Sequence, residues 1–198
     1  MALKTAGRPR TRPAEERRED LVRSAECLFL EKGVEPTTIE DITLRASVSK
    51  GAFYLHFSSK ADVVEALRVR FVQQLLDSVN EEVAMRSRDD WTGKLTGWAN
   101  ACAVGYLNAT RLHHLIFAAA PLPTRNGLTN NLLIDHLADL LITGNHEKAW
   151  SLANPGFTAI FLFNALHGVV NREGIGESEL DRRKLLHDIE DHFRRVVN

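Results

Sequence analysis

Several side chains that can bond to nucleic acid lie close together in one short stretch of the sequence. Lys50, Tyr54, His56 and Lys60 offer donors that reach phosphate oxygens or the edges of bases. The two residues after Lys50 are Gly and Ala, which have little bulk and let a helix sit deep in a groove. A helix that only faces solvent typically carries charged residues there instead. This composition indicates a surface that binds DNA.

A short helix is expected just before this stretch. Thr37 is followed three residues later by Glu40, the spacing of a capping box, so the helix should begin at Thr38. Apolar residues then recur at helical spacing and give the helix one apolar face.

A second short helix is expected after a tight turn. Ser49 is a good N-cap for a helix that starts at Lys50. Phe53 and Phe57 lie one helical turn apart and should point inward, which leaves the polar side chains on the outer side. Two short helices joined by a tight turn make a helix-turn-helix, with a helical hairpin of no function as the alternative.

From Leu21 to Leu67 the chain resembles the TetR family of bacterial transcriptional regulators, through AECLFLEKGVEPTTIEDI, SVSKGAFYLHF and SKADVVEAL. The sequence departs from the family pattern at Thr43, where Ala is usual, and at Ser47, where Gly is usual. Ser47 must therefore take a turn conformation that Gly prefers. The resemblance implies an N-terminal domain of three helices with the helix-turn-helix in the second and third.

This interpretation assigns roles to individual residues. Thr38, Tyr54 and Lys60 should hold phosphates, while Lys50 and its neighbours should meet base edges. The predicted DNA-binding residues are Thr38, Ser49, Lys50, Gly51, Ala52, Tyr54, Leu55, His56 and Lys60.

Composition sets outer limits on the kind of protein. The chain has 198 residues, 44% of them hydrophobic, and no apolar run long enough to span a bilayer, so we expect a cytoplasmic protein without a signal peptide. The formal net charge is −1, yet residues 1–60 carry +2 and the remainder −3. Residues 1–13 are basic and form either a DNA-binding arm or a solubilising tail. Cys27 and Cys102 are too few for a disulfide framework and are expected to be buried.

Helical periodicity throughout predicts an all-α protein. We expect a flexible basic arm at 1–13, a helix-turn-helix DNA-binding domain at 14–60, and a ligand-binding and dimerisation domain at 61–198. Ser59 and Asp62 should cap a long helix that begins at Lys60 and runs past Glu81. The resemblance makes this long helix the candidate lever between the two domains.

The middle of the chain contains an aromatic stripe at helical spacing, within helices expected at Trp91–Ala109 and Arg111–Ala120. Such a stripe is usually core, but the resemblance implies a small-molecule pocket among these helices. The predicted ligand-binding residues are Trp98, Cys102, Tyr106, His113, Phe117, Phe163 and Asn164. They suggest an apolar or aromatic effector.

Two later helices, expected at Leu128–Thr143 and Pro155–Asn171, are apolar nearly all round. A helix without a polar face must be covered on both sides, which indicates a homodimer, with a buried central helix in a monomer as the alternative. The second of them resembles the helix that the family uses in a four-helix dimer interface. The predicted interface residues are Leu133, Leu137, Leu140, Phe161, Ala165 and Gly168.

Motifs for metalloproteases, nucleophilic serines and phosphate loops do not occur in the sequence, and a last amphipathic helix at Ser178–Val197 carries an ordinary charged surface. We therefore expect no catalysis, no cofactor and no metal. The predicted function is a dimeric repressor that binds a semi-palindromic DNA operator and is released by a small molecule. The alternative is a dimeric sensor or carrier whose helix-turn-helix serves a protein partner.

Overall fold

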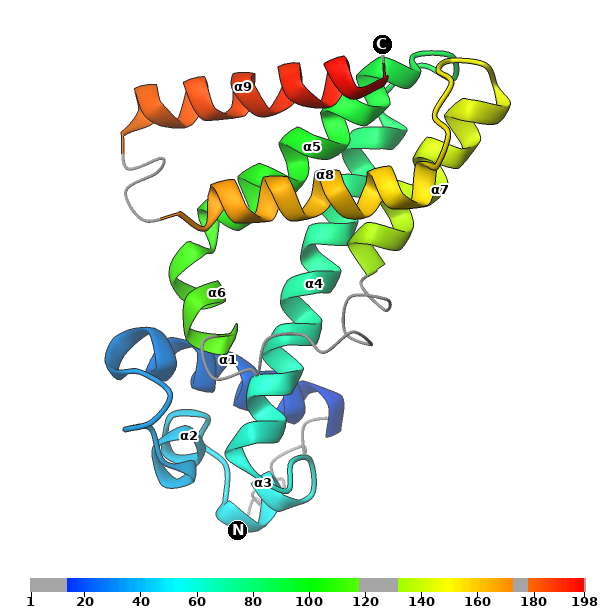
Figure 1. Cartoon of the computed structure of the whole chain (residues 1–198). Helices are drawn as coiled ribbons and strands as arrows, with labels where there is room; N and C mark the ends of the chain where they lie inside the picture. Colours follow the sequence, from blue (N-terminus) through cyan, green and yellow to red (C-terminus); the bar gives the residue numbers. More distant parts are fainter. Residues whose placement is uncertain (1–13, 118–131, 173–177, 198) are drawn as a thin grey trace, which may run out of the picture. The chain divides into compact units, whose positions relative to one another are not determined.

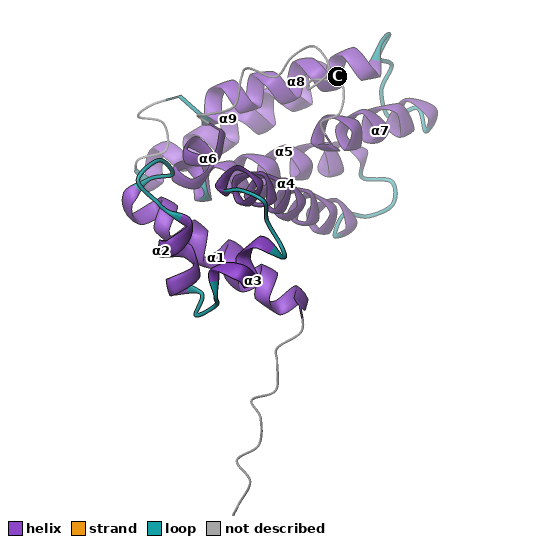
Figure 2. Ribbon diagram, turned by 90° about the horizontal axis from the view of Figure 1, so that it is seen from below, coloured by secondary structure: helices purple, strands orange, loops and turns teal. Residues whose placement is uncertain are grey.

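The computed structural model describes residues 14–117, 132–172 and 178–197, and its regular elements in these ranges are all α-helices, as predicted (Figures 1 and 2). None of the helices in these ranges is both long enough and apolar enough to cross a membrane. The helices are α1 (Ala14–Lys32), α2 (Ile39–Arg45), α3 (Lys50–Tyr54), α4 (Lys60–Ala84), α5 (Trp91–Asn108), α6 (Thr110–Phe117), α7 (Leu132–His146), α8 (Pro155–Val170) and α9 (Glu179–Val197).

Some predicted features lie outside the described residues. These are the basic arm at 1–13, the end of the helix expected to stop at Ala120, and the start of the helix expected at Leu128. Within the described ranges the predicted helices occur, and α7 extends three residues beyond its predicted end at Thr143.

The chain forms two compact units, the first ending at Leu67 and the second beginning at Arg68, so the division falls within α4. The first unit contains α1, α2, α3 and the first turns of α4. Its core is made of apolar side chains that are almost fully buried, as the helical spacing predicted. They are Leu21, Val22, Ala25, Phe29, Ile42, Phe53, Phe57, Val63 and Leu67.

Helix α2 begins one residue later than predicted. Thr38 is its N-cap: the Thr38 hydroxyl accepts from the Asp41 amide at 3.1 Å, and an Asp41 carboxylate oxygen accepts from the Thr38 amide at 2.8 Å. The capping box is therefore made with Asp41 and not with Glu40. Thr37 is buried instead, and its hydroxyl donates to the Gly33 carbonyl at 2.7 Å. This shift leaves the Glu40 side chain free of any capping role.

The turn between α2 and α3 has the backbone that the sequence predicted. Ser47 has φ 55°, the left-handed conformation that favours Gly, and the next amide, of Val48, donates to the Thr43 carbonyl at 3.0 Å. Ser49 then caps α3 by accepting from the Ala52 amide at 3.1 Å. The turn thus fixes where α3 begins and which of its residues face outward.

In the second unit, α7 lies along α8, and α9 lies along α5 (Figure 1). Trp98 of α5 stacks on Phe193 of α9 with ring centroids 6.3 Å apart. Its indole nitrogen donates to His136 Nδ1 of α7 at 3.0 Å, and His136 Nε2 lies 2.8 Å from the Asn80 side-chain oxygen of α4. One imidazole therefore ties α4, α5 and α7 together.

The two cysteines lie in different environments. Cys102 is fully buried in α5, and burial raises the pKa of its thiol well above the ordinary range. Cys27 on α1 is exposed, so the prediction that both cysteines are buried is wrong for Cys27. Its position on the outer face of α1 explains the difference, since the inner face of that helix is filled by Ala25, Leu28 and Phe29.

Candidate nucleic-acid interface

Helix α3 presents the outward surface that its sequence predicted. Phe53 is buried, whereas Lys50, Gly51 and Tyr54 are exposed. Leu55, the C-cap, is 80% exposed, which is unusual for a leucine with core available nearby. This part of the first unit combines a cation, a phenol and an unburied apolar side chain.

The remaining predicted residues frame α3. Ala52 and His56 are half-buried, while Thr38 and Ser49 are exposed at the starts of α2 and α3. The hydroxyls of Thr38 and Ser49 already accept from the amides of Asp41 and Ala52. The structure therefore brings the predicted DNA-binding residues of α2 and α3 together, with two of them also serving as helix caps.

Lys50 forms an ion pair with Glu40, a residue that sequence reasoning considered only as a helix cap. The hydrogen bond from Lys50 lowers the pKa of Glu40, and the same bond raises the pKa of Lys50. Because Glu40 and Lys50 come from different helices, the pair holds the Lys50 ammonium near the start of α2. No spacing rule predicts this pair, because Glu40 and Lys50 lie ten residues apart on different helices.

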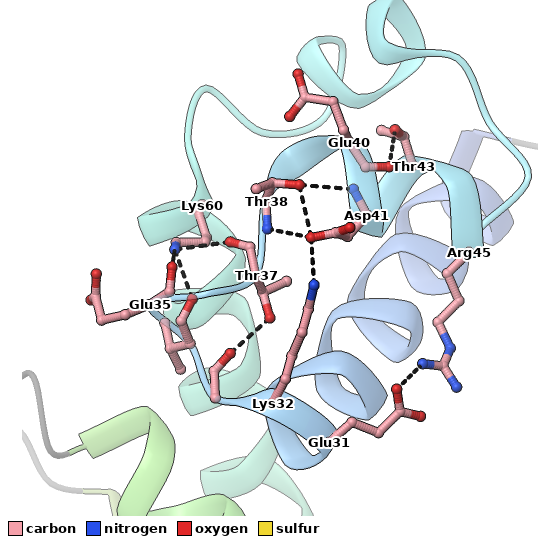
Figure 3. Close-up of polar contacts among 12 residues, drawn as sticks. Glu31, Lys32, Glu35, Thr37, Thr38, Glu40, Asp41, Thr43, Arg45 and Lys60 are labelled. Carbon is pink, nitrogen blue, oxygen red and sulfur yellow. Dashed lines mark hydrogen bonds and ion pairs between the residues drawn. The ribbon is translucent and has the colours of Figure 1, made fainter.

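Lys60 was predicted to hold a phosphate, and the structure gives its ammonium a different set of partners (Figure 3). Its Nζ donates to the carbonyls of Val34, Glu35 and Thr37 at 2.7, 3.1 and 3.0 Å. An ammonium has three donors, so these bonds use all of them. Lys60 therefore ties α4 to the segment between α1 and α2, and a phosphate contact would require at least one of these bonds to be given up.

Two other ion pairs join α1 to α2 on the opposite side from Glu40 (Figure 3). Lys32 donates to an Asp41 carboxylate oxygen at 2.7 Å, and Arg45 donates to Glu31 at 2.7 Å. The bond from Lys32 is the main cause that lowers the pKa of Asp41 far below its ordinary value. These pairs hold α2 on α1, which leaves the Glu40 side of α2 to continue the surface of α3.

The second unit contains a cluster of aromatic and imidazole rings that includes four predicted ligand-binding residues. Tyr106, His113, Phe117 and Phe163 are joined there by His167 of α8. The centroid of the Tyr106 ring is 5.2 Å from that of His113 and 5.1 Å from that of His167. We call these five residues and Phe71 of α4 the ring cluster.

His113 is the most unusual member of the ring cluster. It is 7% exposed, its Nε2 lies 3.5 Å from His167 Nε2, and its Nδ1 has no hydrogen-bond partner among the described residues. Burial, with smaller contributions from His167 and His114, lowers the pKa of His113 to about 4. Burial also lowers the pKa of His167. Both imidazoles are therefore neutral near pH 7, and one buried ring nitrogen of His113 has no hydrogen-bond partner in the part of the chain that the structure describes.

The other three predicted ligand residues lie elsewhere. Trp98 is bonded to His136 and packed on Phe193, and Cys102 is completely buried in α5. Asn164 is exposed on α8, and its side-chain amide donates to the Ile160 carbonyl at 2.7 Å. The predicted ligand-binding residues therefore lie in three places: the core between the helices, the ring cluster and the outer face of α8.

The predicted interface residues separate into two groups. Leu133, Leu137 and Leu140 on α7 are buried inside the chain, because α7 lies along α8 and also packs on α5. These three side chains therefore form part of the core of the second unit, and the exposed apolar residues of the predicted set lie on α8. Phe161 of α8 is instead 60% exposed, and Ala165 and Gly168 on the same helix are exposed.

The outer face of α8 is apolar apart from Asn164. It carries Phe157, Ile160, Phe161, Ala165, Gly168 and Val169. Beside it, α8 and α9 form a groove of about 290 Å³ whose α9 side includes Leu185, Ile189 and Val196. The exposed apolar surface therefore involves α8 and α9, whereas the sequence had indicated α7 and α8.

The geometry of the first unit defines a class of protein. A capped short helix, a turn with a left-handed residue and a second capped helix with an exposed polar surface make a helix-turn-helix domain. Residues 21–67 match the family model described as bacterial regulatory proteins, tetR family. In this domain the chain is similar to bacterial regulatory proteins of the tetR family.

Two curated regulators are similar in the same part of the chain. The transcriptional repressor BepR of Brucella suis is 41% identical over 63 residues, which cover 31% of this chain and 30% of BepR. The transcriptional regulator TtgR of Pseudomonas putida is 41% identical over 68 residues, which cover 34% of this chain and 29% of TtgR. The similarity therefore spans less than a third of the length of either relative.

The fold of the whole chain is similar to that of solved structures. A transcriptional regulator of the TetR/AcrR family from Thermobifida fusca superposes with a TM-score of 0.73 at 20% identity, covering 92% of this chain and 99% of that one. The likeness covers most of the chain and so includes most of the second unit, and it concerns the fold alone.

Proposed function

We propose that this chain is a DNA-binding transcriptional regulator that acts as a homodimeric repressor of a semi-palindromic operator. The observation that carries the proposal is the tetR-family match of residues 21–67 together with the exposed cation, phenol and apolar side chain of the α3 region. Lys50, Leu55 and His56 are the proposed base contacts, and Tyr54 with the start of α2 the proposed phosphate contacts.

The proposed dimer forms through the outer face of α8 and the adjoining side of α9. A monomer that exposed Phe157, Phe161 and Ile160 together would carry an apolar patch of the kind that marks an interaction site. A second copy covers it most simply, because two-fold symmetry places two recognition helices at successive major grooves about 34–36 Å apart.

The proposed effector site is the ring cluster. Its rings come from α4, α5, α6 and α8, so a ligand held there would contact the helix that continues into the first unit. An apolar or aromatic compound with one polar group would place that group against His113 Nδ1. A ligand that binds better to dimers whose recognition helices are wrongly spaced for the operator lowers the population of dimers that can bind DNA.

The proposal is tested by selecting duplex DNA from a random pool with the purified protein and measuring affinity for the selected site at two salt concentrations. A repressor of this kind enriches an inverted repeat, and its affinity falls steeply with salt because phosphate contacts release counterions. If no sequence is enriched in the absence or presence of candidate effectors, the proposal fails in favour of a sensor or carrier that uses α2 and α3 to bind a protein.

A further inference from the structure

The ion pair between Glu40 and Lys50 places a negative charge next to the proposed base-reading cation. Glu40 is the second residue of α2 and Lys50 is the first residue of α3, and the two side chains are 63% and 54% exposed. Ion pairs this open to solvent contribute little to folding. The ion pair should therefore affect what this surface binds more than how stably the first unit folds.

Glu40 is not engaged in holding the first unit together. The neighbouring carboxylate of Asp41 caps α2 and bonds to Lys32, and Glu31 bonds to Arg45. Figure 3 shows Glu40 directed away from these two ion pairs. Glu40 thus belongs to the same outward surface as Lys50.

A carboxylate on a DNA-binding surface weakens the affinity for DNA by an amount that depends on the base sequence. Phosphates repel it, and it loses water when the helix enters a groove. Among the groups in the major groove, the cytosine N4 and adenine N6 amino groups are donors that a carboxylate can accept from, whereas thymine O4 and guanine O6 are acceptors. A sequence that offers acceptors at this point leaves the carboxylate without a partner.

The Lys50 ammonium has the opposite preference, since it donates to guanine O6 and N7 or to phosphates. Held by Glu40, it is drawn away from the phosphates that every sequence provides. The pair as a whole matches a guanine with a cytosine or adenine amino group close by, and it matches DNA without that combination poorly.

We propose that Glu40 is a specificity-determining residue: it positions Lys50 for base contact and disfavours DNA that lacks a cytosine or adenine amino group at this place. The inference rests on the proposed function, since it concerns how the same surface chooses its operator. Its effect falls on the ratio of operator to random-DNA affinity and not on folding.

The test compares Glu40→Gln with the wild-type protein on the selected operator and on random duplex. Glutamine has the same shape, carries no charge, and both donates and accepts, so it tolerates bases that the carboxylate rejects. We expect random-DNA affinity to rise and the operator to random ratio to fall about tenfold, the size of one base contact. The freed Lys50 should also steepen the salt slope on random DNA by about one unit.

Glu31→Gln is the matched control. It makes the same change of charge and shape, and it also breaks an exposed ion pair between two helices, but on the other side of α2. We expect its affinity ratio to stay within about twofold of wild type and its salt slope to be unchanged. Repeating the selection with Glu40→Gln should relax one position in each half-site at which the wild-type protein selects cytosine or adenine.

The possible results separate the inference from the function that it depends on. If the wild-type protein enriches an inverted repeat while Glu40→Gln has the same ratio, slope and selected site, the role of Glu40 is refuted and the regulator stands. If Glu31→Gln lowers the ratio as much as Glu40→Gln does, the effect is one of net charge and the inference is again refuted. If the wild-type protein selects no DNA at all, both proposals fall.

Discussion

Replacing Lys60 by Met removes the ammonium that joins the start of α4 to the segment between α1 and α2. Met keeps much of the length of the aliphatic stem, so the change deletes the hydrogen bonds and leaves most of the packing. Three backbone carbonyls, of Val34, Glu35 and Thr37, lose their donor. The expected result is a first unit that unfolds more easily.

The magnitude follows from how well each bond is shielded. The bonds to Val34 and Thr37 are partly buried, whereas the bond to Glu35 is exposed and its carbonyl can regain a water. A hydrogen bond to a charged group contributes about 1.5–3 kcal/mol. Counting the two shielded bonds at the lower value, Lys60→Met should reduce the free energy of unfolding of the first unit by about 3 kcal/mol.

The assay is urea unfolding followed with two probes. All three tryptophans, Trp91, Trp98 and Trp150, lie in the second unit, so their fluorescence reports that unit while far-UV circular dichroism reports both. In Lys60→Met, part of the dichroism signal should be lost at least about 1 M earlier in urea, and the fluorescence midpoint should not move.

Lys32→Met provides the control, because it removes one lysine charge from the same unit. Lys32 makes a single exposed ion pair with Asp41, so its dichroism transition should shift much less. Equal shifts in the two variants would show that charge and not the three carbonyl bonds is responsible. An unmoved dichroism transition in Lys60→Met, combined with a salt slope on DNA reduced by one unit, would restore the originally predicted phosphate role.

The remaining predictions concern the ring cluster, the dimer and base recognition. His113 has a folded pKa of about 4 against an ordinary 6.5, so the unfolded chain takes up protons first as pH falls, and the free energy of unfolding of the second unit should fall by about 2 kcal/mol between pH 8 and pH 5. In His113→Phe the urea midpoint measured by tryptophan fluorescence should depend less on pH. Equal pH dependence in the two proteins would disprove the assignment. Phe161→Glu on the outer face of α8 should give a monomer in sedimentation at micromolar concentration, whereas Met85→Glu, equally exposed at the end of α4, should stay dimeric. Lys50→Ala should weaken operator binding about 10- to 100-fold and random DNA less, and equal losses on both would argue against base contact.

The first unit was largely predictable because its signals are local. Ser49 with Ala52, Phe53 with Phe57, and the strained Ser47 each depend on residues a few positions apart, and the structure has all three features. The cap of α2 was misplaced by one residue because Thr37 and Thr38 are both good N-caps. Burial of the Thr37 side chain decided between them, and burial is not a local property.

The second unit was less predictable because periodicity identifies an apolar face without naming what covers it. Leu137 and Phe161 both belong to nearly all-apolar helical segments of the sequence, yet the Leu137 side chain is buried inside the chain and the Phe161 side chain is exposed. The partners of Lys60 lie 23–26 residues earlier in the chain, beyond the reach of any spacing rule. His167 joined the ring cluster through a contact with His113, 54 residues away, and only the fold brings these two rings together.

The exposed Cys27 provides a site at which a probe for distance measurements can be attached. Burial keeps the Cys102 thiol protonated and unreachable, so a maleimide spin label or fluorophore should attach at Cys27 alone, without any cysteine being removed. A homodimer would then carry one probe on each first unit. Pulsed dipolar or energy-transfer measurements on the native sequence would read the spacing of the two DNA-binding units directly, with operator bound and again with an effector added.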